Sequence, residues 1–374
     1  MADPTQDNRL IQLVTPLGKD KLLLQSFSGQ EGVSIPFHYD LSMLSLDKSI
    51  KFEDIVGQPA TIKVVLPDDK ERFIDGIFNS FTQCGIAGEF ASYQATLVPR
   101  LWMLTRNADC RIFQDQSALE IIQAILKENG VNNTGDGRLT AGRYQKREYC
   151  VQYSETDFHF VSRLMEEEGI YYFFTHDSSS HTMVLTDDAK NWTTCTDLTA
   201  ANYGGSPADW EDDSLLTGFS IEQTLTTGQV KLDDFSFLTP ATSLLATASG
   251  TDTTRSVYDY PGLYAVQSDG DTKSTLRLDS LDIEQNRITG TSLCRAFQAG
   301  AKFTVAGHYR SDANASYVLR RVSLQVTQER YSNSFEAFPA TAVFRPPMVT
   351  RKPLIPGTQT AMVVGKQGEE IWTD

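Results

Sequence analysis

The densest group of residues that could bind a metal or act as a carboxylate pair is Glu166-Glu167-Glu168, with Asp157 and His159 shortly before it. The apolar spacing of this segment predicts a helix, and adjacent residues on a helix point about 100° apart. The three carboxylates therefore cannot converge on one ion. Because runs of like charge are usually solvated, we expect this run to lie on a solvated helix end.

A second candidate consists of His176 and His181, which flank Asp177 and a run of three serines. Imidazole is a common metal ligand, but only one carboxylate lies near this pair. A metal also needs ligands that the surrounding groups hold rigidly in place. We therefore expect a polar hairpin tip here and no metal site.

Signatures of activated nucleophiles and phosphate-binding loops are missing from the sequence. It contains no G-x-S-x-G elbow, no H-E-x-x-H, no Walker loop and no C-x-x-C. The sequence thus predicts no catalytic residue, no cofactor-binding residue and no metal ligand, and we expect a protein that is not an enzyme.

Two helices must position the acidic candidates. Ser117 and Glu120 form a capping-box pattern, in which each side chain can satisfy the other residue's free backbone N–H. Apolar residues at helical spacing follow and stop at Asn129-Gly130. A second helix is expected after Ser154, with Asp157 in its first turn and Gly169 as its left-handed C-terminal residue.

The rest of the chain is expected to be mainly strands. The first hundred residues show β-branched runs separated by turn residues, with a hairpin turn at 67–69, and could close a small antiparallel barrel. Expected strands in this part are Leu22–Phe27, Phe37–Leu46, Ala60–Leu66, Arg72–Phe81 and Tyr93–Leu97. Further strands are expected at Ile170–Phe174, Gln229–Phe237, Arg287–Phe297 and Lys302–Ala306, a helix at Lys273–Ile283, a loop at Ala246–Thr254, and the start of a hairpin at Thr360–Val364 and Glu369–Trp372.

An internal repeat links the two β-rich parts. Thr82-Gln83 matches Thr327-Gln328 at an offset of 245, since 327 − 82 = 245, and the same offset relates Ile77 to Val322 and Tyr93 to Phe338. Short strand patterns recur by chance, so shared strand composition is one explanation. The other is two related antiparallel β-barrels that flank a mixed α/β section.

The composition of the chain disfavours several classes of binding partner and location. The formal net charge is −15, which disfavours nucleic acid and anionic membrane surfaces. No run of eighteen apolar residues is present, and the first residues lack the basic and apolar regions of a secretion signal. Five widely spaced cysteines are typical of reduced thiols and not of a disulfide framework.

The segment from Tyr149 to Phe173 closely resembles the signature of the VgrG family of type VI secretion spike proteins. Other parts of the chain resemble landmarks of that family in the same order. These are LTRNADCRIFQDQSALEII at 104–122, Tyr260-Pro261-Gly262, Cys294-Arg295-Ala296-Phe297, Phe344-Arg345-Pro346-Pro347, 359–365 and 370–374.

The resemblance implies a phage-hub-like fold and a structural function without catalysis or cofactors. It implies a first hub barrel at 5–105, a mixed α/β section at 106–209, a second hub barrel at 210–345, and a linker with the start of a truncated OB-fold at 346–374. It also implies a homotrimer that caps a ring of Hcp hexamers and contacts baseplate components. A PAAR-type tip protein and effectors would attach to the C-terminal part that this sequence lacks.

The same resemblance implies assembly in the cytoplasm and release by the type VI machine without a signal peptide. Three alternatives stay open at this point. The first is the hub of a contractile phage or pyocin tail. The second is a hydrolase built on a β-rich fold, which would need clustered carboxylates or a nucleophile on its loops. The third is an adhesin-like binding module, which would normally carry a secretion signal.

Overall fold

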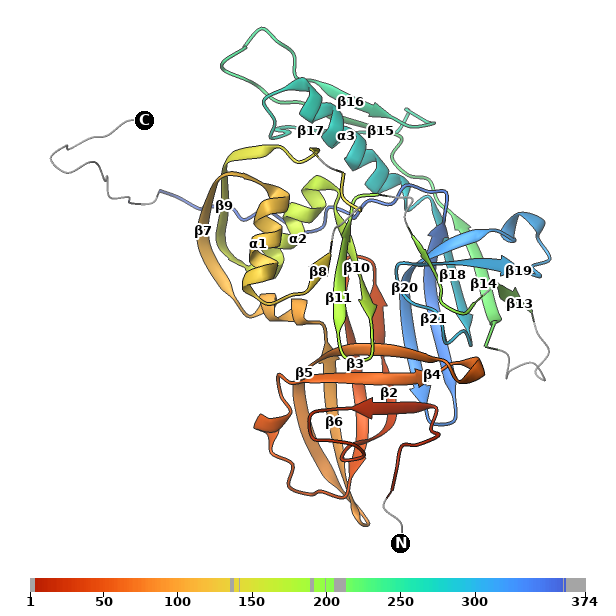
Figure 1. Cartoon of the computed structure of the whole chain (residues 1–374). Helices are drawn as coiled ribbons and strands as arrows, with labels where there is room; N and C mark the ends of the chain where they lie inside the picture. The colour runs from red at the N-terminus through yellow and green to blue at the C-terminus, as the bar shows by residue number, and fades with distance from the viewer. Residues whose placement is uncertain are drawn as a thin grey trace, which may run out of the picture.

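The computed structural model describes residues 4–134, 138–140, 142–188, 192–198, 200–204, 213–358 and 360, and is drawn in Figure 1. Its described part is mainly β, with few helices. The α-helices are α1 (Ala118–Glu128), α2 (Asp157–Glu168) and α3 (Gln267–Asp282). None of the described helices combines the length and apolar character needed to cross a bilayer.

One large sheet runs through most of the chain. Its strand order is β1 (Ile11–Val14), β4 (Pro59–Val65), β5 (Glu71–Ala87), β6 (Phe90–Val98), β3 (Ile35–Ser45), β2 (Leu23–Gly32), β20 (Ser316–Thr327), β21 (Tyr331–Pro339), β18 (Asn286–Ser292), β14 (Leu215–Gln223), β13 (Ala201–Tyr203), β19 (Ala301–Ala306) and β12 (Thr193–Thr194). Alternating side chains of these strands form the main apolar core.

Three small sheets complete the described part of the chain. They are β10 (Tyr171–His176) with β11 (His181–Thr186) and β8 (Asn133–Thr134); β16 (Ala246–Ser249) with β15 (Gln229–Leu232) and β17 (Ser256–Asp259); and the pair β7 (Ala108–Ser117) and β9 (Lys146–Thr156). The β7–β9 pair curves around α1 and α2, and α3 lies over β15 and β16 (Figure 1).

The large sheet contains the same strand order twice. The first six strands of the chain lie side by side in the order β1, β4, β5, β6, β3, β2. Six strands of the C-terminal half lie in the equivalent order β13, β19, β20, β21, β18, β14. The pairing of β19 with β20 closes this second set into a ring. We call these two groups the first and second strand groups. The small sheet with α3 is inserted between β14 and β18 of the second group.

The residue offset seen in the sequence holds along one strand and fails in the next. Ile77 on β5 and Val322 on β20 are both buried and 245 apart. Their hairpin partners are Val98 and Phe335, which are 335 − 98 = 237 residues apart. The constant offset is therefore wrong as a residue-for-residue equivalence of β6 and β21, because the second hairpin is shorter.

A single strand joins the two groups. The start of β20 pairs with β19 of its own group, and its part from Arg321 to Thr327 pairs with β2 of the first group. The long hairpin of β20 and β21 accordingly runs down beside β2 and β3 in Figure 1. Segments at the two ends of the chain thus share one continuous sheet.

Because β20 occupies the edge of β2, no backbone ladder connects β2 to β1, and two glutamine side chains bridge them. Gln6 Oε1 accepts hydrogen bonds from the N–H groups of Leu13 (2.9 Å) and Leu24 (3.1 Å). Gln328, directly after β20, donates from Nε2 to the carbonyls of Ile11 (2.9 Å) and Leu24 (2.5 Å). The amides satisfy backbone groups that burial would otherwise leave unpaired.

The local predictions from the sequence have mixed outcomes. The capping box of Ser117 and Glu120 is confirmed, as is Gly169, which ends α2 with a φ of 66°. The N-cap of α2 is Thr156, and α3 starts at Gln267, earlier than expected. The loop expected at 246–254 is wrong for its first part, because Ala246 and Ala248 of β16 pack beneath α3.

Two further expectations concern the C-terminal half. The strand expected at 229–237 ends at Leu232, where Asp234 turns the chain by accepting hydrogen bonds from the N–H groups of Leu263 and Tyr264. The hairpin expected at 360–364 and 369–372 lies outside the described residues, apart from Thr360.

Replacing Gln328 with Met keeps the side-chain volume and removes the amide bridge. We expect Gln328→Met to lower the free energy of unfolding by about 1–3 kcal/mol, because buried backbone groups of Ile11 and Leu24 lose their partners. Urea denaturation of the purified chain measures this. Gln94→Met, at an exposed position on β6, is the matched control and should change stability by less than about 0.5 kcal/mol. Equal effects of the two variants would contradict a bridging function for Gln328.

Candidate functional site

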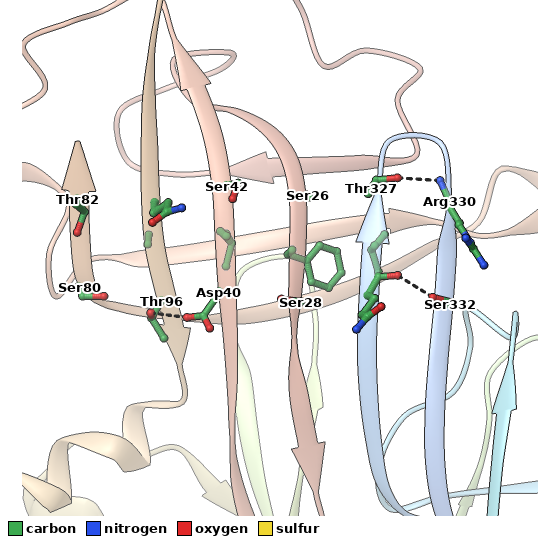
Figure 2. Close-up of a pocket in the computed structure, with 16 residues that line it drawn as sticks. Ser26, Ser28, Asp40, Ser42, Ser80, Thr82, Thr96, Thr327, Arg330 and Ser332 are labelled. Atoms are coloured by element: carbon green, nitrogen blue, oxygen red, sulfur yellow. Dashed lines mark hydrogen bonds between the residues drawn. The ribbon is translucent and has the colours of Figure 1, made fainter. Parts of the chain in front are cut away.

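A hollow lies on the surface over the joint of the two strand groups. It has a volume of about 720 Å³ and crosses β5, β6, β3, β2, β20 and β21. Figure 2 shows small hydroxyl side chains projecting from neighbouring strands into this hollow. The labelled hydroxyl residues are Ser26, Ser28, Ser42, Ser80, Thr82, Thr96, Thr327 and Ser332.

The hollow carries few charges and no exposed aromatic ring. Asp40 accepts a hydrogen bond from the Thr96 hydroxyl (2.7 Å), and the backbone N–H of Arg330 donates to Thr327 Oγ1 (3.1 Å) (Figure 2). These side chains stand on the outward positions of strands whose inward positions are apolar. The described lining of this hollow is therefore mainly small and polar.

A buried ion pair lies beneath the same joint. Glu31 on β2 and Arg72 on β5 are 4% and 7% exposed, and Arg72 Nη2 donates to Glu31 Oε1 at 2.9 Å. The Tyr39 hydroxyl and the backbone N–H of Ala299 also donate to Glu31, each at 3.0 Å. The carboxylate thereby holds two strands of the first group and the loop that precedes β19 of the second group.

The guanidinium of Arg72 completes this network. It donates to the carbonyl of Arg295 (3.0 Å) and to the Tyr331 hydroxyl (3.3 Å), which both belong to the second group or its loops. Burial opposes the charge of Arg72, but the Glu31 carboxylate and smaller contributions from Tyr331, Tyr39 and Cys195 together outweigh it and raise the pKa of Arg72. Burial together with Glu31 raises the pKa of Tyr39 well above its ordinary value.

The acidic run at the end of α2 is half-buried and paired. Glu167 and Glu168 both bind Arg147, at 2.8 and 2.7 Å. Glu166 accepts hydrogen bonds from the backbone N–H and hydroxyl of Thr350. The expectation of a solvated helix end therefore holds only in part, because the carboxylates also tie α2 to β9 and to the C-terminal segment.

Asp157 and His159 have separate partners. Asp157 accepts from Arg111 (2.6 Å) and Gln152 (2.9 Å), and His159 lies 2.7 Å from a carboxylate oxygen of Glu155. The structure thus leaves the acidic candidates in different networks. Among the described residues, no three His, Cys, Asp or Glu side chains are placed to share a metal ion.

The hairpin tip of β10 and β11 is polar only at its turn. Asp177 is exposed and accepts hydrogen bonds from Ser179 and Ser180. His176 and His181, however, pack inward against β5, where His181 Nδ1 lies 2.7 Å from an oxygen of Asp75. The expectation of a polar tip holds for the turn and misses the burial of both imidazoles.

The structural residues at the joint were missed by sequence reasoning. Arg72 falls on the same strand alternation as Ile74, Gly76 and Phe78, which face the core. Glu31 falls on the alternation of Phe27 in the same way. A charged residue on the apolar side of a strand pattern is the signal that could have identified them.

A sequence profile of the Phage tail baseplate hub (GPD) family matches residues 30–330 of this chain. The chain belongs to this family. Over 384 aligned residues it is 34% identical to the type VI secretion system spike protein VgrG1b of Pseudomonas aeruginosa, and the match covers 99% of this chain and 52% of that protein. This hub chain thus spans about half the length of that relative.

The fold agrees with the family. A type VI secretion component of E. coli, similar in structure to the T4 bacteriophage tail proteins gp27 and gp5, superimposes with a TM-score of 0.69 at 21% identity, over 92% of this chain and 82% of the other. The 43 kDa tail protein of prophage MuSo2 from Shewanella oneidensis gives 0.63 at 10% identity, over 90% and 100%. The expected VgrG resemblance and the mainly β, phage-hub-like fold are confirmed. The chain is homologous to type VI spike proteins and to phage tail hub proteins.

Removing one partner of the buried pair should be costly. We expect Glu31→Gln to lower the free energy of unfolding by about 3–5 kcal/mol, because it leaves the buried guanidinium of Arg72 without its counter-charge. The exposed pair of Arg310 and Asp312 is the control, and Asp312→Asn should have a much smaller effect on stability, because solvent screens the pair. Chemical denaturation compares the two. Similar losses would show that the buried pair does not stabilise the joint.

Proposed function

We propose that this chain is the hub portion of a type VI secretion spike, in which three copies form a ring that caps the tube of stacked Hcp hexamers. The observation that supports this most directly is the repeated strand order in one continuous sheet. A tube of hexamers presents six equivalent surfaces, whereas a trimer of single units presents three. A chain with two similar strand groups gives a trimer six similar faces.

In this proposal the two strand groups are related β-barrels, at about 5–105 and 210–345, which alternate around a threefold axis as a pseudo-sixfold ring. The closed pairing of β13, β14, β18, β21, β20 and β19 supports a barrel in the second group. The glutamine bridges between β1 and β2 support closure of the first. The mixed α/β section at 106–209 packs beside both barrels.

The remaining parts of the proposal concern the longer protein. The segment at 346–374 leads into an OB-fold, and a triple-stranded β-helix follows it in the spike. Baseplate components contact the hub, and a PAAR-type tip protein and effectors attach at the far end. The trimer assembles in the cytoplasm, and sheath contraction drives it out of the cell without a signal peptide.

A phage tail hub is the nearest competing function. The likeness to the prophage tail protein is one of fold alone, at 10% identity. The likeness to the Pseudomonas spike protein extends over 99% of this chain at 34% identity. Sequence identity of that extent favours the spike.

The joint between the strand groups provides a test of this function. A Cβ at Gly29 would collide with the His38 carbonyl oxygen and with the ring of Tyr39. We expect Gly29→Ala, introduced into the full-length gene, to abolish release of the tube protein into the medium, as gene deletion does. Gln25→Ala, at an exposed position of the same strand outside the hollow, should restore release in the deletion strain.

Electron microscopy of the full-length spike on its tube completes the test. We expect six lobes around the hub with threefold alternation. A ring of three lobes, or normal tube release in the deletion strain, would contradict the proposed function.

A further inference from the structure

The tip of the β10–β11 hairpin is fastened to the first strand group by two half-buried histidines. His176 and His181 are directly opposite each other on the two strands, and their rings pack against Phe37 of β3. The backbone N–H of Asp75 donates to His176 Nδ1 at 3.1 Å, and the backbone N–H of Arg100 donates to His181 Nε2 at 3.0 Å. Each imidazole therefore uses its unprotonated nitrogen to accept a main-chain hydrogen bond.

These acceptor contacts fix the tautomers. Because Nε2 of His181 accepts a hydrogen bond, the ring proton of His181 is on Nδ1, which donates to Asp75 Oδ1 at 2.7 Å. The Thr61 hydroxyl donates to the other carboxylate oxygen of Asp75 at 2.8 Å. With Nδ1 of His176 accepting, its proton is on Nε2, a buried atom without a hydrogen-bond partner among the described residues. A protonated imidazole carries N–H on both nitrogens and cannot accept, so the docked tip fits only neutral rings.

We propose that this tip is an acid-sensitive latch, which docks the hairpin on β5 at neutral pH and releases it when the His176 imidazole takes up a proton. The release is local, because the base of the hairpin has other attachments. Ser34 N–H donates to the Tyr172 carbonyl, and Gln298 Nε2 donates to the Phe174 carbonyl. The latch rests on contacts within this chain and does not depend on the proposed secretion function.

The charged surroundings determine the direction of the response. The charged groups that face the two rings are Asp75 and Arg72 from β5 and Asp177 from the turn. The other neighbours are uncharged: a main-chain amide from η3 (Arg100–Thr105), a hydroxyl from β4 and an apolar ring from β3.

Burial, with smaller contributions from His181 and Arg72, lowers the pKa of His176 from 6.5 to about 3. A released tip binds this proton near pH 6.5, and the docked tip does not bind it until about pH 3. Docking is therefore fully favoured above pH 6.5 and weakens as the pH falls, by up to about tenfold per pH unit.

Hydrogen–deuterium exchange of the whole chain tests the latch. Between pH 7.0 and 5.5, after correction for intrinsic exchange rates, we expect protection of the peptides containing Asp75 and Arg100 to fall several-fold, by up to about tenfold. Peptides from β15 and β16 should keep their protection. Unchanged protection at Asp75 and Arg100 would overturn the proposal.

Non-titrating variants separate the histidines from the carboxylates. In His176→Asn and His181→Gln, the amide oxygen can accept the same main-chain N–H, so we expect protection at neutral pH with a reduced acid response. His38→Asn, at an exposed position on β3, is the control and should respond like the wild type. An undiminished acid response in the double variant would contradict the latch.

Should the variants fail to fold, imidazole ¹⁵N chemical shifts of the wild-type chain decide the question. We expect the Nε2–H tautomer at His176 and the Nδ1–H tautomer at His181 at pH 7. A doubly protonated ring at either position while the tip is still docked at pH 5.5 would overturn the proposal.

Discussion

The shared strand β20 is the constraint on which the rest of the hub depends. A strand has two edges, and β20 gives one of them to β21 and divides the other between β19 and β2. This arrangement fuses the two strand groups without a linker. Because β20 pairs with β2, that edge of β2 is not available to β1, and no backbone ladder closes the first group. The side chains of Gln6 and Gln328 perform that closure, since an amide offers the same donor and acceptor as a peptide group.

The buried network of Glu31 and Arg72 follows from the same fusion. Bringing β2, β5 and the loop at 293–300 together leaves main-chain groups of Arg295 and Ala299 facing the core, and each finds its partner in this ion pair. A buried pair is weak evidence for net stability, because desolvation of the charges offsets their attraction. Its directional hydrogen bonds do distinguish one packing of the two groups from others, which apolar contacts alone would do poorly.

Local features were predictable from the sequence, and features of the joint were not. The caps of α1 and α2 could be identified because Ser117, Glu120 and Gly169 act on backbone groups within a few residues of themselves. The roles of Arg72 and Gln328 depend on partners more than 200 positions away, which no window of sequence brings together. The repeat was visible along β5 and β20, where burial is alike. It was misaligned in β6 and β21, because a change in hairpin length moves the register without changing the strand order.

The joint explains why the two strand groups would resist bending relative to each other. Hinges occur where a few loop residues can absorb a change of backbone angles. Here three features connect the two strand groups: the backbone ladder between β20 and residues Ser26 to Gly32 of β2, the ion pair of Glu31 and Arg72, and the β10–β11 hairpin, which Gln298 contacts. Relative motion would have to break the ladder along its whole length at once. The large insertion in the second group lies between β14 and β18, away from this ladder, so the chain has gained new surface without weakening the joint.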